Sequence, residues 1–339
     1  MKTEILDLKK ENIEKCISRA AEILKNGGIV AVPTETVYGL AASSFDDDAV
    51  KKVFAAKGRP QDNPLIVHIS DKEMLGSVAV DIPEIANTLA ENFWPGPFTM
   101  VLKKGGNICG SVSCGLDTVA VRLPDNEVTR AVIRQSGLPI AAPSANVSGY
   151  PSPVSAAHVI KDLNGKIDAV LCHEDSKVGL ESTVVTLVTN PPRLLRPGAV
   201  TVEQLKEFIP DLVVDNAVLN ELSKNERAAS PGMKYKHYSP KTNVVMVEGD
   251  GEAYCKFVNS KENSIAVCFE EDKDISIPKM IYGSNQKEET LAQNIFKVLR
   301  QLDELPYGTA YVHAPSKTGI GLAVYNRLIR SAGYKVEKL

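Results

Sequence analysis

The chain has 339 residues, a length that favours two domains over one. Hydrophobic residues make up 43% of the sequence and charged residues 24%, which is typical of a globular protein with sizeable cores. The formal net charge of -3 excludes the strongly basic field of a general nucleic-acid binder, so any RNA contact would need a local basic patch.

The first half of the chain alternates between strand and helix patterns. At 12–25, apolar residues recur on one helical face, Asn12 can cap the start, and a Gly-Gly pair follows the end. Further helices are predicted at 46–59, 82–93 and 153–163, and strands at 29–32, 63–70, 98–104, 118–124, 138–146, 168–173 and 182–188. This alternation predicts an α/β fold.

From about residue 211 the periodic pattern weakens, and the segment 223–242 is polar, basic and rich in proline, as in a linker. A new alternation of strands and helices then begins. Strands are predicted at 243–249, 264–271, 279–283 and 309–315, and helices at 251–259, 290–304 and 321–333. The sequence thus predicts a first domain at 1–210, a linker at 211–242 and a Rossmann-like second domain at 243–339.

The N-terminus and the cysteines indicate a cytoplasmic protein. The first residues, MKTEILDLKKENIEKC, lack the apolar segment of a signal peptide, and no window reaches the roughly 18 apolar residues of a membrane span. The six cysteines form no CxxC pair and no zinc-type spacing with histidine. Cys109 and Cys114 could form a disulfide, although two reduced thiols are more usual in the cytoplasm. We expect no metal site and no membrane partner.

The strand at 29–32 runs straight into polar residues, in the stretch GIVAVPTETVYGL. Pro33, Thr34, Glu35 and Thr36 follow the apolar run without an intervening turn. A core strand that ends in polar side chains needs an explanation beyond core packing.

Two cations follow the helix predicted at 46–59, in FAAKGRPQDNPLIVHI. Lys57 and Arg59 lie two residues apart and could converge on one anion, or they could be the solvated cations of an ordinary helix end. His68, on the next strand, fits either a binding site or a hydrogen-bonded core position.

The strand at 118–124 has an apolar face and a second face that carries Thr118 and ends in Arg122. Burying a guanidinium without a partner costs several kcal/mol, on the order of the penalty for any isolated buried charge. Arg122 is therefore either a ligand contact or one half of a structural salt bridge.

Hydroxyl and amide groups follow two later strands. Ser144 and Asn146, in PIAAPSANVSG, lie among small residues that let backbone N–H groups approach an anion, although a polar surface loop has the same composition. Ser182 in GLESTVV and Arg196 in RLLRPGA add a further hydroxyl and a further cation. Strand ends rich in hydroxyls and arginines suit a small zwitterion beside a polyphosphate.

Common catalytic signatures are missing from the sequence. There is no Walker A loop, because SKTGIG (316–321) lacks the first glycine at the required spacing. Neither HExxH nor a GxSxG elbow occurs.

Taken in order, seven motifs resemble those of the YrdC-like family of threonylcarbamoyl-AMP synthases: PTETVYGL, KGRPQDNPLIVHI, WPGPFT, TVAVRLP, PSANVSG, GLESTVV and RPGA. The segment SPGMKYKHYSP (230–240) and the α/β unit after it are similar to the linker and second domain of the long form of that family. The resemblance covers nearly the whole chain. It implies a twisted α/β domain with an open concave site, followed by a smaller Rossmann-like α/β domain.

The resemblance implies a nucleotidyltransferase that makes threonylcarbamoyl-AMP and pyrophosphate from L-threonine, bicarbonate or CO2, and ATP. The product serves N6-threonylcarbamoyladenosine formation on tRNA. The residues implied for threonine are Thr36, His68, Arg122, Ser144 and Ser182. Those implied for ATP are Arg59, Asn63, Thr118, Asn146, Val154, Arg196 and His237, and Lys57 and Arg59 take the catalytic role.

Several expectations follow from this reaction. The polar residues after the strand at 29–32 become one wall of the amino-acid pocket, with Thr36 facing the substrate and Tyr38 packed beneath. Mg2+ is expected on the ATP phosphates. Because carbamates and adenylates hydrolyse readily, the segment 230–240, with Lys234, Tyr235 and Tyr238, is expected to close as a lid, the alternative being an inert tether.

Two other functions remain open at this stage. One is a carbamoyltransferase that forms carbamoyl-adenylate, although the zinc-finger cysteines and acylphosphatase-like region of such larger enzymes are missing here. The other is a non-catalytic RNA-binding protein, which the near-neutral charge disfavours. Partners beyond the substrates could include tRNA or downstream threonylcarbamoyl-transferase proteins.

Overall fold

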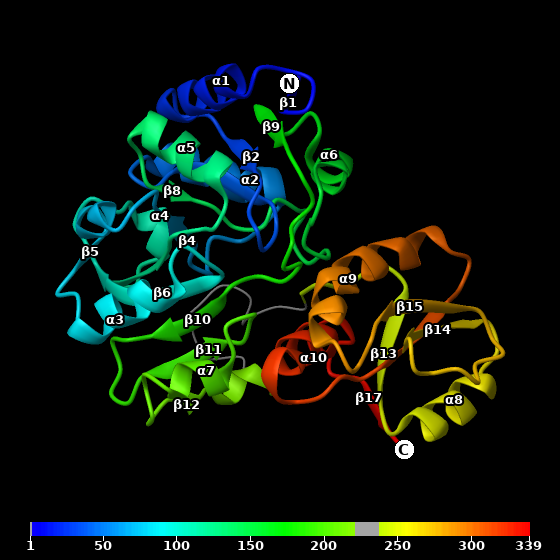
Figure 1. Ribbon diagram of the computed structural model, residues 1–339. Coiled ribbons are helices and arrows are strands. Elements are labelled where there is room, and N and C mark those ends of the chain that lie inside the picture. The colour runs from blue at the N-terminus through cyan, green and yellow to red at the C-terminus, as the bar shows by residue number, and fades with distance from the viewer. Residues whose placement is uncertain (1, 221–236) are drawn as a thin grey trace.

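Two β-sheets organise the chain in the computed structural model, which describes residues 2–220 and 237–339. The first sheet and its helices occupy the blue to green part of Figure 1, and the second sheet occupies the yellow to red part. The two units correspond to the two α/β domains expected from the sequence.

The first sheet is mixed, with the strand order β1-β9-β2-β3-β8-β4-β7-β6-β10-β11-β12, and β5 pairs with β6. At its centre β4 runs parallel to β7, while β6 runs antiparallel to β7 and parallel to β10. The strands are β1 (Glu4–Asp7), β2 (Val30–Val32), β3 (Gly39–Ser43), β4 (Ile66–His68), β5 (Ala79–Val80), β6 (Phe98–Lys104), β7 (Thr118–Arg122), β8 (Ile140–Ala141), β9 (Ala169–Cys172), β10 (Thr183–Thr186), β11 (Arg193–Arg196) and β12 (Val213–Val214).

The helices of this domain begin and end at residues suited to those positions. Asn12 accepts a hydrogen bond from Lys15 N at the start of α1, and Asp46 caps α2, which ends at Gly58 in the left-handed conformation. The helical segments are α1 (Ile13–Lys25), α2 (Asp47–Lys57), η1 (Glu73–Ser77), α3 (Glu84–Phe93), α4 (Gly110–Ser113), α5 (Glu127–Ser136), α6 (Ala156–Leu163), α7 (Val202–Lys206) and η2 (Asn216–Val218).

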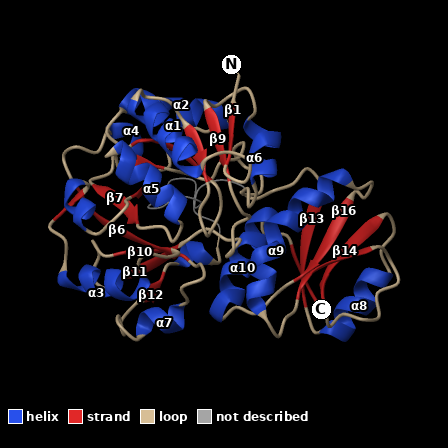
Figure 2. Ribbon diagram, turned by 45° about the horizontal axis from the view of Figure 1, so that its top comes forward, coloured by secondary structure: helices blue, strands red, loops and turns tan. Residues whose placement is uncertain are grey.

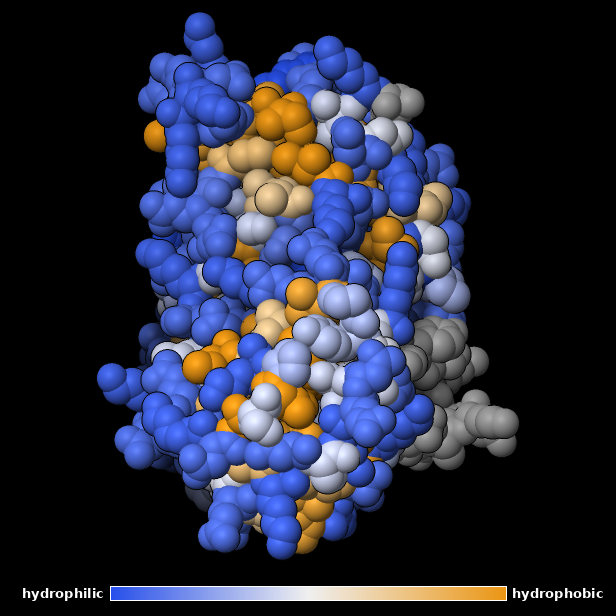
Figure 3. Space-filling model, turned by 90° about the vertical axis from the view of Figure 1, so that its right-hand side faces the viewer, coloured by the Kyte–Doolittle hydropathy of each residue, from blue (hydrophilic) through white to orange (hydrophobic). Residues whose placement is uncertain are grey.

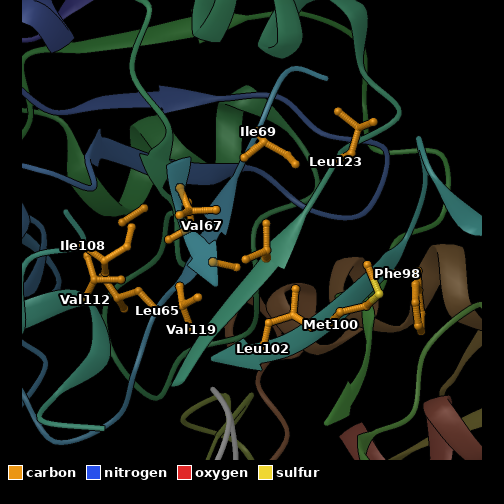
Figure 4. Packing of buried hydrophobic residues seen from close by; sticks show 14 of the residues in the cluster. Leu65, Val67, Ile69, Phe98, Met100, Leu102, Ile108, Val112, Val119 and Leu123 are labelled. Carbon is orange, nitrogen blue, oxygen red and sulfur yellow. The ribbon is translucent and has the colours of Figure 1, made fainter. Parts of the chain in front are cut away.

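The central strands β4, β6 and β7 have one face that packs into the main hydrophobic core and a second face that carries both polar residues and a small hydrophobic cluster. Leu65, Val67, Ile69, Val119 and Leu123 point into the same buried cluster, as Figure 4 shows. Because side chains alternate along a strand, His68 and Arg122 lie on the opposite face. The hydrophobic core thus leaves one face of the strands for the functional groups.

The second sheet is entirely parallel, in the order β15-β14-β16-β13-β17. Its elements are β13 (Asn243–Glu248), α8 (Gly251–Asn259), β14 (Ser264–Phe269), β15 (Lys279–Gly283), α9 (Glu288–Gln301), η3 (Leu302–Glu304), β16 (Thr309–His313), α10 (Gly319–Ser331) and β17 (Val336–Lys338). Both α9 and α10 lie on the side of this sheet that faces the first domain, and α8 lies on the other side (Figures 1 and 2).

The two domains share hydrophobic packing. One buried cluster joins Val37, Val154 and Leu180 of the first domain to residues of the second, including Phe296. At Gly179 the approach is close, because an added Cβ would lie 2.5 Å from the carbonyl oxygen of Ala292 in α9. Seen from the side of the second domain, the molecular surface is mostly hydrophilic, with hydrophobic patches separated from one another (Figure 3).

The structure confirms the predicted α/β class and the parallel second domain. The predicted domain limits stay a prediction, and the first sheet ends with β12 while the second begins at Asn243. Cys109 and Cys114 are free thiols, so the disulfide does not form. In residues 2–220 and 237–339, every helix is too short or too polar to span a bilayer.

Candidate active site

A cavity of about 70 Å3 lies on the face of β4 and β7 that carries His68 and Arg122. Its walls come from segments far apart in the sequence, including the chain that follows β2, the residues before β10, the end of β11 and the end of the linker. Nine of the residues that the sequence singled out line it: Thr36, Arg59, His68, Arg122, Ser144, Ser182, Arg196, His237 and Tyr238.

Arg122 lies at the C-terminal end of β7 and is 3% exposed. Its Nη1 donates to Thr36 Oγ1 at 2.8 Å, and its Nε donates to the carbonyl of Gly96 at 3.1 Å. Nη2 lies 2.6 Å from Glu35 Oε1, but this contact is an ion pair without an aligned hydrogen bond. Glu35 therefore balances the charge of Arg122. Among the residues that the structure describes, Nη2 has no hydrogen-bond acceptor, so it can still donate to a ligand.

Thr34 holds the polar segment after β2 in a tight turn. Its hydroxyl donates to the carbonyl of Val37 at 2.6 Å and lies 2.8 Å from Thr36 Oγ1, which places the Thr36 hydroxyl toward Arg122. Tyr38 is fully buried and donates to the carbonyl of His173, at 3.2 Å, rather than reaching the cavity. The side chain of Thr36 thus faces the cavity and that of Tyr38 packs behind it, as the sequence predicted.

Ser182 and Arg196 form a second polar pair on the cavity wall. The Nε of Arg196 donates to the carbonyl of Ser182 at 2.9 Å, and its Nη2 donates to the Ser182 hydroxyl at 3.1 Å. That hydroxyl also lies 2.7 Å from Thr99 Oγ1 on β6. Burial lowers the pKa of Arg196 to about 10, and the guanidinium stays charged at neutral pH. Arg196 has no carboxylate within 4 Å among the described residues, so its charge can attract an anion.

Both histidines in the cavity wall are neutral at physiological pH. Burial, together with the nearby charge of Arg122, lowers the pKa of His68 to about 3. Burial, together with Arg59, lowers the pKa of His237 to about 3. His68 Nδ1 and His237 Nε2 have no hydrogen-bond partner in the described chain, so each can serve a ligand as a neutral hydrogen-bonding group.

Lys57 does not line the cavity. Its ammonium group is buried and donates to the carbonyl oxygens of Ser144, at 2.5 Å, and Asn146, at 2.7 Å. Burial and the neighbouring charge of Arg59 lower its pKa well below the usual value. Lys57 supports the loop that carries Ser144 and Asn146. Of the two cations Lys57 and Arg59, only Arg59 lines the cavity.

Four other predicted ATP residues lie outside the cavity lining. Thr118 is at the opposite end of β7 from Arg122, on the same face, about 13 Å away at 3.3 Å per residue. It borders a separate hollow together with residues of β10 and β11. Asn63 is buried and its amide has no hydrogen-bond partner among the described residues. Asn146 donates to the carbonyls of Val147 and Tyr150, and Val154 is fully buried.

The predicted lid falls only partly within the described chain. His237 and Tyr238 line the cavity, and the ring of Tyr238 lies 5.2 Å from that of Phe296 in α9. Lys234 and Tyr235 lie outside the described residues.

The sequence reasoning did not name Glu181, which lines the cavity. It directly precedes a predicted residue, Ser182, and a carboxylate beside an expected cation site was the signal for it. Two of the polar residues expected to form one wall of the pocket contribute as well: Thr34 lines the cavity and Glu35 pairs with Arg122. Val37, Gly39, Ile66, Ala142 and Pro143 complete the lining.

Models of two protein families match this chain. A family model described as "Telomere recombination" (Sua5_yciO_yrdC) matches residues 22–198, and one described as "Threonylcarbamoyl-AMP synthase, C-terminal domain" matches residues 200–333. A threonylcarbamoyl-AMP synthase of Pyrococcus abyssi is 42% identical, over 99% of this chain and 100% of that protein. One of Bacillus subtilis is 42% identical, over 94% of each chain.

A solved structure extends the likeness to three dimensions. The crystal structure of P. abyssi Sua5 complexed with L-threonine is 40% identical, covers 100% of both chains and has a TM-score of 0.90. The match therefore includes both domains. This chain belongs to the threonylcarbamoyl-AMP synthase family, in its two-domain form.

Proposed function

We propose that this chain is a nucleotidyltransferase that converts L-threonine, bicarbonate or CO2, and ATP into threonylcarbamoyl-AMP and pyrophosphate. One observation supports this most directly: Arg122 and Arg196 open onto one cavity together with the hydroxyls of Thr36 and Ser182. Two buried guanidinium groups in one cavity suit a substrate pair with two anionic groups, a carboxylate and a polyphosphate.

Threonine is assigned to the part of the cavity around Arg122. Its carboxylate would take up the remaining hydrogen-bonding capacity of the guanidinium, while Glu35 balances the charge from behind. The hydroxyls of Thr36, Ser144 and Ser182 can accept or donate hydrogen bonds to the amine and the side-chain hydroxyl. Neutral His68 adds a polar atom without adding charge.

ATP is assigned to the part around Arg59, Arg196 and His237, and it would extend along β7 toward Thr118. Asn63, Asn146 and Val154 are proposed to contribute on that path, with Lys57 acting through the loop that it supports. Arg59, Arg196 and neutral His237 complement phosphate oxygens, and Glu181, a carboxylate of the lining, is already paired with Arg327. We therefore propose that Mg2+ arrives on ATP and is held mainly by the phosphates and water.

The chemistry needs positioning and charge stabilisation rather than a protein nucleophile. The neutral amine nitrogen of threonine attacks the carbon of CO2, loses a proton and becomes an N-carboxylate. An oxygen of that group attacks the α-phosphorus, and the bond to the departing pyrophosphate breaks. Arg59 and Arg196 would offset the charge on the phosphates. His237 and Tyr238 would shield the intermediates from water as part of a lid.

The product supplies the threonylcarbamoyl group for tRNA modification. We propose that a second protein transfers that group to adenosine, because the proposed reaction ends with the free adenylate and includes no tRNA substrate. We propose a cytoplasmic location, together with contact to such a transferase or to tRNA.

Threonine-dependent release of pyrophosphate from ATP tests this function directly. The purified chain should release pyrophosphate only when threonine and bicarbonate are both present, and mass spectrometry should find threonylcarbamoyl-AMP. Carbamoyl phosphate supporting turnover in place of threonine and bicarbonate would indicate the carbamoyltransferase instead. Salt-dependent tRNA binding without turnover would indicate the RNA-binding protein.

A further inference from the structure

An arginine of the second domain reaches into the wall of the active-site cavity. Arg327 lies on α10 and is fully buried, with 0% of its surface exposed. Its Nε donates to Glu181 Oε2 at 2.9 Å, and its Nη2 donates to the backbone carbonyl of Glu181 at 3.2 Å. Its Nη1 donates to the carbonyl of Pro197 at 2.8 Å. All three acceptors belong to the first domain.

These acceptors flank the two residues that form the Ser182–Arg196 pair. Glu181 directly precedes Ser182, and Pro197 directly follows Arg196. Strand β10 begins at Thr183 and β11 ends at Arg196, and the two strands are antiparallel neighbours. Arg327 therefore bridges the entry to one strand and the exit from the other, at the point where both reach the cavity.

We infer that Arg327 is a positioning residue through which the second domain holds Ser182 and Arg196 in register across the active site. The inference rests on the proposed function, which assigns threonine to Ser182 and ATP to Arg196. Arg327 touches neither substrate in this arrangement, because it does not line the cavity. It acts on the alignment of the two substrates. A misplacement of about 1 Å can lower the reaction rate on the order of 100-fold.

Two further contacts support this role. The carboxylate of Glu181, which lines the cavity, is held between Arg327 and the hydroxyl of Ser152, which donates at 2.5 Å. The guanidinium of Arg327 also lies 5.8 Å from the centre of the Tyr238 ring, at the end of the linker. One side chain of the second domain thus contacts a cavity carboxylate, two strand ends and the closing segment.

The charge at Glu181 fits a fixed ion pair. Burial raises the pKa of its carboxyl group, but the charges of Arg327 and Arg196 outweigh burial and lower the pKa below the usual value. A lysine at position 327 would keep the positive charge but would have one nitrogen in place of the three that Arg327 uses. The geometric role can therefore be separated from the electrostatic role.

The test compares Arg327→Lys with Arg300→Met in the full-length protein. Arg300, on α9, is the matched control because it is also a buried inter-domain arginine, 5% exposed, and it pairs with Asp162 and the carbonyl of Pro151 outside the cavity. For each protein, kcat and KM are measured by threonine-dependent pyrophosphate release. Thermal unfolding reports stability, and calorimetry reports threonine binding.

We expect Arg327→Lys to lower kcat/KM at least tenfold for both threonine and ATP, with a fall in kcat as well as a rise in each KM. Arg300→Met should lower the unfolding temperature by a similar amount or more, while its kcat stays within twofold of the wild type. Wild-type kinetics in Arg327→Lys would overturn the inference, as would an equal loss of kcat in both variants. If Arg327→Lys does not fold, Glu181→Gln, which weakens the same bridge, should show the same combined fall in kcat and rise in KM, and wild-type kinetics there would also overturn it. A wild-type protein that fails to release pyrophosphate would refute the proposed function instead.

Discussion

The guanidinium of Arg122 donates to the hydroxyl of Thr36 at 2.8 Å, although 86 residues separate the two in the sequence. The contact joins the end of β7 to the polar turn that follows β2, and Glu35 balances the charge from the same turn. It accounts for the polar residues directly after a core strand. They complete a binding surface for which β7 supplies the cation.

Replacing Arg122 with lysine should weaken threonine use. Lysine keeps the charge but loses the forked donors, and a hydrogen bond to a charged group is worth about 1.5–3 kcal/mol. We therefore expect kcat/KM for threonine to fall about 10- to 100-fold in a pyrophosphate-release assay, with a smaller change in KM for ATP. Arg130→Lys, at a more exposed ion pair with Glu127, serves as the control and should change neither constant.

Replacing Arg59 with alanine should act mainly on ATP. Arg59 lines the cavity and donates to the carbonyl of Asn63, so its loss removes a cation from the proposed phosphate site. We expect KM for ATP to rise at least tenfold, while calorimetric threonine binding without ATP stays within twofold. Lys52→Ala, at an exposed position of α2, the helix that precedes Arg59, is the control. Adenylate formation within twofold of the wild type would show that Arg59 has no such role.

Replacing Gly198 with alanine should disturb the turn that follows Arg196. An added Cβ would lie 2.4 Å from the backbone nitrogen of Thr183, and backbone atoms cannot yield as a flexible side chain can. We expect a loss of about 1–3 kcal/mol in the free energy of unfolding, measured with urea, together with reduced activity. At Gly110 no atom lies within 4 Å of an added Cβ, so Gly110→Ala should leave the free energy of unfolding and the activity unchanged within error.

The stability of the protein should decrease in acid, in part through His68. Its pKa is about 6.5 in the unfolded chain and about 3 in the folded protein, so between these values the unfolded chain binds more protons. The contribution to stability is complete above pH 6.5 and is lost as the pH falls toward 3, by up to about 1.4 kcal/mol per pH unit.

Urea unfolding at several pH values checks this expectation. The difference in free energy of unfolding between the wild type and His68→Gln should shift in favour of the variant as the pH falls from 6.5 to 5. A difference that stays constant over this range would mean that His68 binds protons equally in both states.

Much of the fold could be predicted from local patterns. The cap at Asn12 and the apolar stripe after it predict α1, and the predicted strand at 98–104 and helix at 251–259 coincide with β6 and α8. These elements depend on side-chain periodicity and caps, which the neighbouring residues contain. The strand expected at 138–146 is only Ile140–Ala141, because its length depends on how far β3 and β4 pair alongside it.

The ordered motifs also indicated most of the cavity wall, but not how each side chain points. Lys57 was expected to take a catalytic role with Arg59, and only the folded chain brings the carbonyls of Ser144 and Asn146 within reach of its ammonium group. Thr118 and Arg122 lie on the same face of β7, but they are at opposite ends of the strand and border different hollows.

The contribution of the second domain depends entirely on tertiary structure. In the sequence, Arg327 is an ordinary arginine in a helix, 146 residues from Glu181. Period and capping are local properties and can be read along the chain. The partner of a buried charge is chosen by the packing of distant elements, so it exists only once α10 has docked against the ends of β10 and β11.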